Sequence, residues 1–436
     1  MKINSTTLLA LSALTIFGCS HLGSHSASAL HQHQVALAKE STKLGDGPTD
    51  KQIEKLRGVI EKHPDHIDSM EKLGLAYMQK GRETGELDWY VLGRDTLTKA
   101  QKLDPKNGSI LGNLALCMTI FHNFGEATSL AKEAVKLDSR DHRALGVLTD
   151  SYLELGRYEE ALDACQKMID IKPDLASYSR AARLRFIYGD NKGAGLLMEK
   201  AVQCGSQYSE NTAWCRTMLA EMYWKSGATA AAEQQVKLAL EKFPNYRHAQ
   251  MMKGRIDLAR GKTQEAVALM ESATKGQAPI PYLSELQDAY ELIGDAEKAK
   301  SIAKRVDETV SDYHKRTIGG EEPQVAMYEL EHGGNIQKAL ELCEAEVKEH
   351  TSVDVYATLA WAYFKHNRIP EAQEAMKSAL RTNIQDPMLF YRAGKIDQAA
   401  GELTNARKNF QKALSLNSQF HPVYAKEASQ NLVVRR

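Results

Sequence analysis

The sequence lacks the charge bias and the strand pattern that mark several large classes of protein. Its 56 Lys and Arg residues are balanced by 56 Asp and Glu residues, so the formal net charge is zero. A protein that binds nucleic acid through a basic face usually carries an excess of positive charge, and this chain has none. Proline is scarce, at 11 of 436 residues, and 43% of the residues are hydrophobic. No segment alternates apolar and polar residues, so β-strands are expected to be almost absent.

Motifs of catalytic and cofactor sites are also missing. Gly261-Lys262-Thr263 resembles the end of a P-loop, but Ile256 occupies the position that the motif reserves for its first glycine. Two Ser-x-x-Lys matches, at 272–275 and 301–304, have no companion motif. The sequence contains no His-Glu-x-x-His helix, no Gly-x-Ser-x-Gly elbow and no paired Cys-x-x-Cys sites. It therefore predicts no enzymatic activity, no cofactor, no metal and no small-molecule substrate.

What the sequence does contain is a repeat of 34 residues. Pro105 and Pro173 lie 68 residues apart, which is two periods of 34. The same period of 34 separates Phe124 from Tyr158 and Ala127 from Ala161. Self-similarity at a fixed period indicates supersecondary units that bury their apolar faces only by stacking.

The repeated residues resemble the tetratricopeptide repeat (TPR) family, whose pattern has Leu-Gly, Tyr, Gly, Ala and Pro at set positions. The clearest copy holds Leu148, Tyr152, Gly156, Tyr158, Ala161, Met168 and Pro173. Other copies hold Leu73-Gly74, Tyr77, Ala100 and Pro105; Leu219-Ala220, Tyr223, Ala232 and Pro244; and Ala393-Gly394, Ala406, Phe410 and Ala413. The resemblance implies an all-α, right-handed superhelical solenoid of about ten antiparallel helix pairs.

The matched positions are packing positions and carry no activity. Ala or Gly lets two helix backbones approach where they cross, and a larger side chain would overpack the crossing. The repeat glycines suit left-handed helix C-caps, and they are Gly81, Gly156, Gly227, Gly261, Gly294 and Gly401. Apolar residues recur at helical spacing in Leu145, Leu148 and Tyr152, which predicts a helix with one buried face.

The first 50 residues form a different kind of sequence. The apolar run from Leu8 to Phe17 is too short to span a bilayer and reads as the hydrophobic core of a signal peptide. Ile16-Phe17-Gly18-Cys19-Ser20 follows the form of a bacterial lipobox, although Phe17 is an unusual occupant. The interpretation preferred here is a signal peptide over 1–18 and lipidation of Cys19. The alternative is cleavage after Ala27-Ser28-Ala29 and an ordinary secreted protein.

Residues 19–50 are rich in Ser, Gly, His and Gln and are expected to form a flexible tether. We interpret its histidines as a solvated spacer, because a disordered segment offers a metal no fixed geometry. The expected divisions after the tether are a TPR array over 51–313, further repeats over 321–417 and a C-terminal cap or tail over 418–436. Segment 313–323, with Gly319-Gly320, is interpreted as a hinge or a joint between the two arrays.

Cys117, Cys165 and Cys343 fall where a small buried residue is expected. Cys204 and Cys215 flank a helix junction, and spacing alone leaves open whether they pair.

The resemblance implies that the first helix of each pair lines a concave groove. The repeat register then places these candidate partner-binding residues on it: Arg143, Asp150, Arg183, Glu221, Trp224, Arg255, Trp361 and Phe364. Exposed aromatic and Arg side chains often anchor protein partners. The competing interpretation is that Trp224 and Phe364 are buried between neighbouring first helices. Some members of the family clamp a C-terminal carboxylate with Lys and Asn, but Glu71 and Leu75 occupy the matching positions here.

One insertion of about seven residues interrupts the period between Gly81 and Leu92. It contains Trp89 and Tyr90, and such insertions often contact partners, although a longer loop or helix is the alternative. Together these features predict a non-catalytic scaffold, anchored in the cell envelope and facing the periplasm, that holds a protein or peptide partner in its groove. Its only contact with the membrane would be the N-terminal lipid. The alternative is a soluble periplasmic assembly or carrier cofactor for secreted or cofactor-bearing proteins.

Overall fold

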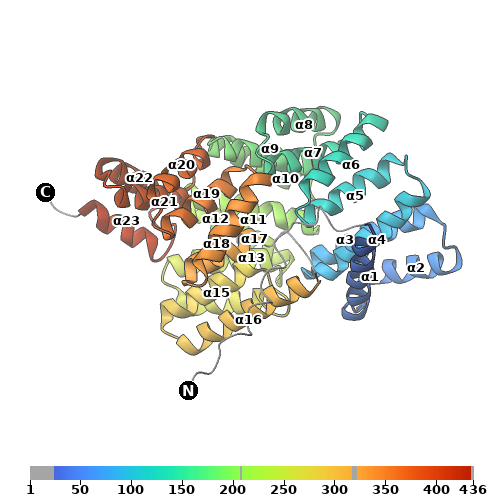
Figure 1. Ribbon diagram of the computed structural model, residues 1–436, viewed down its shortest axis with the longest axis horizontal. Coiled ribbons are helices and arrows are strands. Elements are labelled where there is room, and N and C mark those ends of the chain that lie inside the picture. The colour runs from blue at the N-terminus through green and yellow to red at the C-terminus, as the bar shows by residue number, and fades with distance from the viewer. Residues whose placement is uncertain (1–23, 207–208, 317–321, 434–436) are drawn as a thin grey trace, which may run out of the picture.

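The protein is all-helical in the part of the chain that the computed structural model describes, residues 24–206, 209–316 and 322–433 (Figure 1). No β-strand occurs in those ranges, and no helix within them is long and apolar enough to cross a membrane. The N-terminal helices are α1 Ser24–Ser41, α2 Pro48–Lys62, α3 Ile67–Thr84, α4 Leu87–Leu103, α5 Gly108–Ile120, α6 Phe124–Leu137, α7 His142–Glu154 and α8 Tyr158–Ile171. The central helices are α9 Leu175–Ile187, α10 Asn191–Cys204, α11 Glu210–Lys225, α12 Thr229–Lys242, α13 Arg247–Ala259, α14 Thr263–Ala273, α15 Ile280–Ile293 and α16 Ala296–Arg316. The C-terminal helices are α17 Glu322–His332, α18 Ile336–Glu349, α19 Val353–Lys365, α20 Ile369–Ala379, α21 Pro387–Ala399, α22 Leu403–Leu416 and α23 Tyr424–Val433.

From α3 to α22 the helices pack as consecutive antiparallel pairs, and each pair stacks on the next. This arrangement confirms the predicted solenoid. The small residues of the repeat lie at the crossings within pairs, as predicted. Ala161 is fully buried between α7 and α8, and a Cβ added to Gly394 would lie 2.7 Å from the ring of Phe410. The repeat therefore encodes how closely the two helices of a pair approach.

The predicted turn glycines adopt the left-handed conformation with one exception. Gly156 and Gly227 have φ values of 70° and 75°, which an L side chain rarely adopts. The prediction for Gly81 is wrong, because α3 continues to Thr84 and the left-handed residue is Gly85, with φ 73°. Gly81 instead lies inside α3, where a Cβ would meet the Tyr90 ring at 2.5 Å.

The insertion lengthens α3 and α4, in line with the alternative of an extended helix. Trp89 is fully buried, stacks on Tyr77 at 5.9 Å and donates a 2.9 Å hydrogen bond from Nε1 to Glu86. Tyr90 is 9% exposed and packs against Gly81. Neither aromatic ring of the insertion is available to a partner, because both are buried where α3 and α4 pack together.

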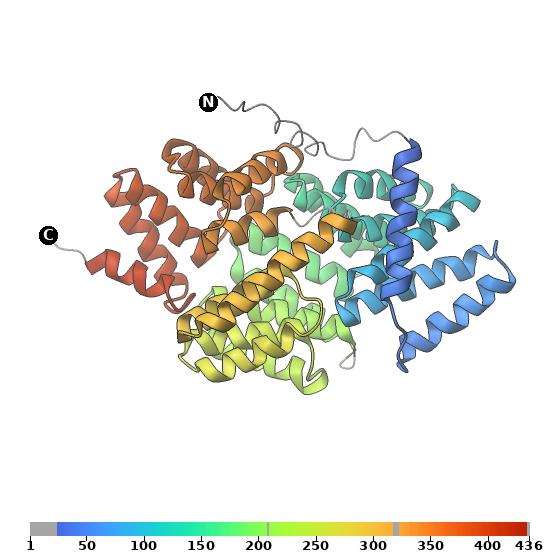
Figure 2. The same ribbon diagram turned by 60° about the horizontal axis from the view of Figure 1, so that its bottom comes forward.

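Residues 24–41 form helix α1, which differs from the flexible tether expected there. Val35 and Ala38 are buried on one face of this helix, which packs on α4 and contacts the end of α16 (Figure 2). Arg94 of α4 donates a 2.6 Å hydrogen bond to Gln34. The apolar residues Val35 and Ala38, three positions apart, give α1 a buried edge despite its polar composition. Cys19 and the expected signal peptide lie outside the described residues, as do residues 317–321 of the expected hinge.

The solenoid curves until its C-terminal pairs lie against the earlier pairs α7/α8, α9/α10 and α11/α12 (Figure 1). We call the contact between them the seam: the turns within pairs α7/α8, α9/α10 and α11/α12 pack on the loops that precede α19, α21 and α23. One buried hydrophobic cluster crosses the seam and includes Tyr158, Ile187, Val353 and Ile384. A superhelix that is closed in this way has less open groove than the repeat pattern alone implies.

Three left-handed glycines explain how the backbones come so close at the seam. A Cβ added to Gly156, Gly189 or Gly227 would lie 2.4, 2.2 or 2.6 Å from a backbone oxygen of Thr351, Asn383 or Leu416. Comparable left-handed glycines at 261, 294 and 401 have no neighbouring heavy atom within 4 Å of the added Cβ. At the seam the absent side chain therefore serves both the turn conformation and the contact between layers.

Candidate functional site

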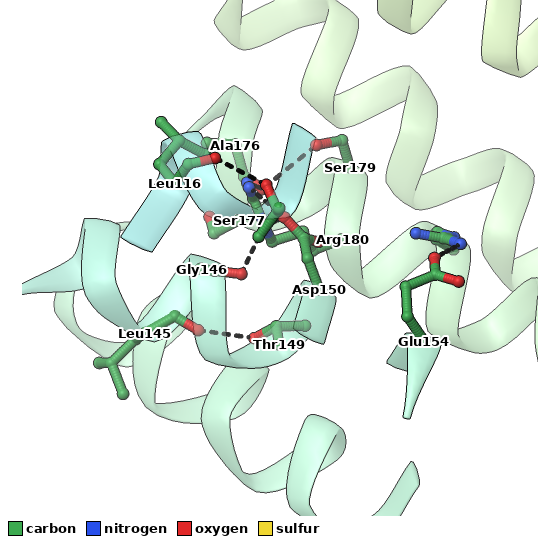
Figure 3. A network of polar contacts seen from close by, with 12 residues as sticks. Leu116, Leu145, Gly146, Thr149, Asp150, Glu154, Ala176, Ser177, Ser179 and Arg180 are labelled. Carbon is green, nitrogen blue, oxygen red and sulfur yellow. Dashed lines mark hydrogen bonds and ion pairs between the residues drawn. The ribbon is translucent and has the colours of Figure 1, made fainter. Parts of the chain in front are cut away.

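The inward side of the solenoid carries ion pairs that link one first helix to the next. Arg180 of α9 bonds Asp150 of α7 through Nη2 at 2.6 Å and through Nε at 3.0 Å (Figure 3). Arg180 also donates a 3.1 Å hydrogen bond to the backbone oxygen of Gly146. One turn further along the same helices, Arg183 pairs with Glu154. Asp150 and Arg183, both predicted groove residues, are thus already bound within the protein.

The same link recurs further along the array. Arg255 of α13 binds Glu285 of α15 with both arms of its guanidinium, and the Nε contact is 2.6 Å long. Lys225 of α11 bridges Glu221, at 3.0 Å, and Asp386, the N-cap of α21, at 2.9 Å. The second contact spans the seam, so it ties the first helix α11 to the loop that precedes α21. Of the predicted groove residues, Glu221 and Arg255 therefore take part in internal ion pairs.

The electrostatics of this inner side favour the paired state. Glu154 raises the pKa of Arg183, against the opposite effect of burial. Burial alone would lower the pKa of Lys225, but Asp386 and Glu221 outweigh it and raise that pKa. The carboxylate of Asp354 in α19 reaches solvent and has no hydrogen-bond or ion-pair partner among the described residues. Partial enclosure by protein and the nearby charge of Glu154 raise its pKa.

The predicted aromatic anchors are mostly unavailable. Trp224 is 6% exposed and Trp361 is 4% exposed, so these two belong to the core. Phe364 is half-buried and stacks on Trp361 at 4.7 Å. The expectation of exposed Trp anchors is wrong, because neighbouring first helices cover these large apolar side chains.

A shallow pocket of about 430 Å³ lies where α5, α6 and α7 meet, and Arg143 lines it. The other lining residues are Gly108, Ser109, Gly112, Asn113, Leu137, Asp138, Arg140, Asp141 and His142. Asp141 accepts from the backbone N–H groups of Arg143 and Ala144, and Asp138 accepts from that of Arg140. Both carboxylates are thus engaged by the backbone. Across the described chain, the exposed guanidinium groups of Arg140 and Arg143 have no side-chain partner.

Sequence reasoning identified Arg143 and missed the rest of this pocket. The signal for Leu137 was present, since Leu103 and Leu137 are one period apart and are both about half exposed. Recognising them required knowledge of which side of α4 and α6 faces solvent. Arg140 precedes α7 and falls outside the helical register that was used to choose groove residues.

A separate cluster joins α15 to α17. Three potential ligand atoms lie within 4.8 Å of one another, one from each of Asp288, Glu291 and His332. Burial lowers the pKa of His332, which favours the neutral form of its ring. Burial and the charges of Glu331, Glu291 and Glu285 raise the pKa of Asp288 to about 8. Sequence reasoning expected no metal and did not consider these residues, because His332 lies 41 positions after Glu291 and 44 after Asp288.

The cysteines add no link between repeats in the described residues. Cys204 is exposed and Cys215 is buried, and both are free thiols in the structure. Cys117, Cys165 and Cys343 are buried, as their positions in the repeat predicted.

The stacked helix pairs define a helical-repeat scaffold. Residues 121–185 and 217–279 match two family models, both described as tetratricopeptide repeat. These two segments of the chain are therefore tetratricopeptide repeats. No curated protein matches the chain.

Similar solved structures include a thermophilic TPR protein of Thermus thermophilus, which is 20% identical. That match covers 44% of this chain and 99% of the other, with a TM-score of 0.40. A TPR protein of Parabacteroides merdae is 16% identical over 61% of this chain and 98% of its own, with a TM-score of 0.43. YrrB, described as a TPR protein with an unusual peptide-binding site, is 18% identical over 47% of this chain and 99% of its own, with a TM-score of 0.31.

Proposed function

We propose that this protein is a non-catalytic scaffold of the cell envelope that binds an acidic segment of a protein partner at the pocket between α5, α6 and α7. The observation that carries the proposal is the pair of exposed guanidinium groups, Arg140 and Arg143, beside the apolar Leu137. Arg recognises carboxylates with a planar fork of donors, and apolar area beside it adds affinity. The inner ion pairs are less suitable, because a partner would have to displace Asp150, Glu154 or Glu285 from their Arg residues.

The pocket is tested by reversing its charge. The double variant Arg140→Glu/Arg143→Glu is expected to lose most of the partner that the wild-type chain captures from envelope extract. Lys102→Glu/Lys136→Glu is the matched control, because it makes the same charge change at two exposed residues outside the pocket. Partner capture at the wild-type level by the Arg140→Glu/Arg143→Glu variant would exclude the pocket. An equal loss of capture in both double variants would indicate attraction by net charge alone.

The envelope location rests on the N-terminal sequence. The apolar run of residues 8–17, followed by Cys19, supports export and lipidation of that cysteine. In this proposal the lipid attaches five residues before the start of α1, so the scaffold is held close to the membrane surface.

Labelling with radioactive palmitate separates an anchored scaffold from a soluble periplasmic one. We expect palmitate label on the wild type and none on Cys19→Ala. The variant should be released from the membrane fraction, and its helix content should stay unchanged. A Cys19→Ala chain that still sediments with membranes at high salt would contradict lipid anchoring.

A further inference from the structure

The cluster of Asp288, Glu291 and His332 has the ligand types of a transition-metal site. Asp288 and Glu291 lie three positions apart on α15, which places them on one face of that helix, and His332 ends α17. The His332 side chain is 7% exposed, whereas those of Asp288 and Glu291 are 45% and 53% exposed. A buried imidazole thus faces two carboxylates that solvent can reach. Imidazole nitrogen and carboxylate oxygen are both common ligands of zinc.

The imidazole of His332 is held with one nitrogen directed at a carboxylate. Its Nε2 lies 2.9 Å from Ser284 Oγ, and the ring packs on Tyr328 at 4.5 Å. Its Nδ1 lies 3.8 Å from Glu291 Oε1, which is too far for a hydrogen bond. When Nε2–H donates to Ser284, the lone pair of Nδ1 faces the negative Glu291. An oriented imidazole whose second nitrogen is bonded to the protein is the usual arrangement of a histidine that binds metal.

The cluster also lacks the cation that stabilises its counterparts elsewhere in the array. Asp150 has Arg180 and Glu285 has Arg255, each on an adjacent first helix. Glu331, next to His332, is bound by Arg392 at 2.7 Å and by the Tyr424 hydroxyl at 2.9 Å. In the described chain, Asp288 makes its ion-pair contact with His332, at 3.9 Å, and Glu331 of the same helix adds a further negative charge. The charges of Glu285, Glu291 and Glu331 therefore surround Asp288, which makes no ion pair with Lys or Arg in the described chain.

We propose that Asp288, Glu291 and His332 bind one divalent transition-metal ion of the zinc type, which links α15 to α17. A zinc ion sits about 2.0–2.2 Å from nitrogen and oxygen ligands, so its ligand atoms lie a little over 3 Å apart. The separation of 3.8 Å between His332 Nδ1 and Glu291 Oε1 is close to that value, and one ligand atom of each of the three residues lies within 4.8 Å of the others. Rotation of the two exposed carboxylate side chains brings them within range, and water completes the coordination. The ion then takes the place that Arg residues hold in the other links between first helices.

Zinc binding to the purified, chelator-treated full-length chain tests the proposal. Isothermal titration is expected to give one zinc site that also raises the midpoint of thermal unfolding. The test variant is Asp288→Asn/Glu291→Gln, in which both substituted side chains are substantially exposed, so that folding is retained. It should lose the site and the thermal shift. Glu265→Gln/Glu297→Gln removes two exposed carboxylates from α14 and α16 and should keep both.

The N-terminal histidines require their own control. A chain with His21, His25, His31 and His33 changed to Gln should still bind one zinc ion if the cluster is the site. Zinc binding that disappears in this chain, that persists in Asp288→Asn/Glu291→Gln, or that is absent from the wild type would overturn the proposal. His332→Gln provides a second check with cobalt in place of zinc. Loss of the nitrogen ligand should change the visible absorption spectrum of the bound cobalt.

Discussion

Asn417 donates a 2.7 Å hydrogen bond from Nδ2 to the backbone oxygen of Trp224, which lies 193 positions earlier in the chain. Two further hydrogen bonds span almost the same distance in sequence. Thr351 Oγ1 donates to the oxygen of Leu155, and Asn191 Nδ2 donates to the oxygen of Gln385. These three contacts recur once per helix pair, so the two layers of the solenoid meet in register. The seam is therefore a repeated interface.

The seam glycines should be far less tolerant of substitution than glycines in equivalent turns elsewhere. Gly189→Ala places a methyl group about 2.2 Å from the oxygen of Asn383, in addition to the strain of a φ of 78°. We expect it to lower the free energy of unfolding by about 2–4 kcal/mol, from backbone strain and overpacking together. Gly401→Ala has the same strain in open space and should cost about 1–2 kcal/mol. Equal losses in urea titrations would mean that the layers separate easily.

Lys225 should stabilise the docked position of the C-terminal layer. Lys225→Met leaves Glu221 and Asp386 without their shared cation, and we expect a loss of about 2 kcal/mol. Hydrogen exchange should accelerate in both segments that meet there, 222–228 and 382–389. Lys237→Met is the control, since Lys237 is 68% exposed and lies 3.9 Å from Glu241. Unchanged exchange in both segments after Lys225→Met would show that the ion pair does not hold the layers together.

Overpacking the best-formed repeat should damage it locally. Ala161 is fully buried at the α7/α8 crossing, so Ala161→Trp should cost about 3 kcal/mol or more and loosen the neighbouring pairs. Leu162→Trp, at the next residue, points outward from a position that is 38% exposed and should change stability by less than about 0.5 kcal/mol. Circular dichroism during thermal unfolding distinguishes the two, and similar midpoints would contradict the assigned packing.

Acid should destabilise the protein partly through His248. Burial, with smaller effects of Arg247 and Arg255, lowers the pKa of this ring to about 4. The unfolded chain takes up the proton near pH 6.5, so stability is complete above that pH and falls as the pH drops toward 4. The loss attributable to this one ring is at most about 3 kcal/mol.

The measurement is urea unfolding between about pH 7.5 and pH 4.5. His248→Gln keeps a polar group near the Tyr282 hydroxyl, which contacts the His248 ring, and should flatten the pH dependence. His63→Gln alters an exposed histidine and should leave that dependence as in the wild type. The same slope in all three proteins would assign the acid sensitivity to other groups.

Local sequence determined the features that depend on one repeat and its neighbours. The Ala161 crossing and the turn at Gly156 were predictable, because the same residue types recur every 34 positions. The links Asp150–Arg180 and Arg255–Glu285 are each 30 positions apart, so the repeat register could also have predicted them. Asp150 and Arg255 were instead interpreted as free groove residues, because each was considered without its neighbour in the next repeat.

The seam and the candidate sites were beyond the reach of the repeat. Thr351 and Asn383 are ordinary loop residues, and their contact with Gly156 and Gly189 depends on the curvature accumulated over several pairs. The insertion aromatics were misjudged for a related reason. Whether Trp89 faces solvent depends on how far α3 and α4 extend, and composition does not specify helix length.

The long sequence separation of the seam contacts also constrains the order in which the chain can fold during synthesis. The turns at 155–158 and 188–191 are made almost 200 residues before the loops that cover them. Each N-terminal pair can fold on its neighbours as it emerges, but its glycine turn stays uncovered until translation is nearly complete. A nascent chain halted after α16 would therefore present a row of bare turns to chaperones. Synthesis of the last three helix pairs and α23 then covers these exposed turns.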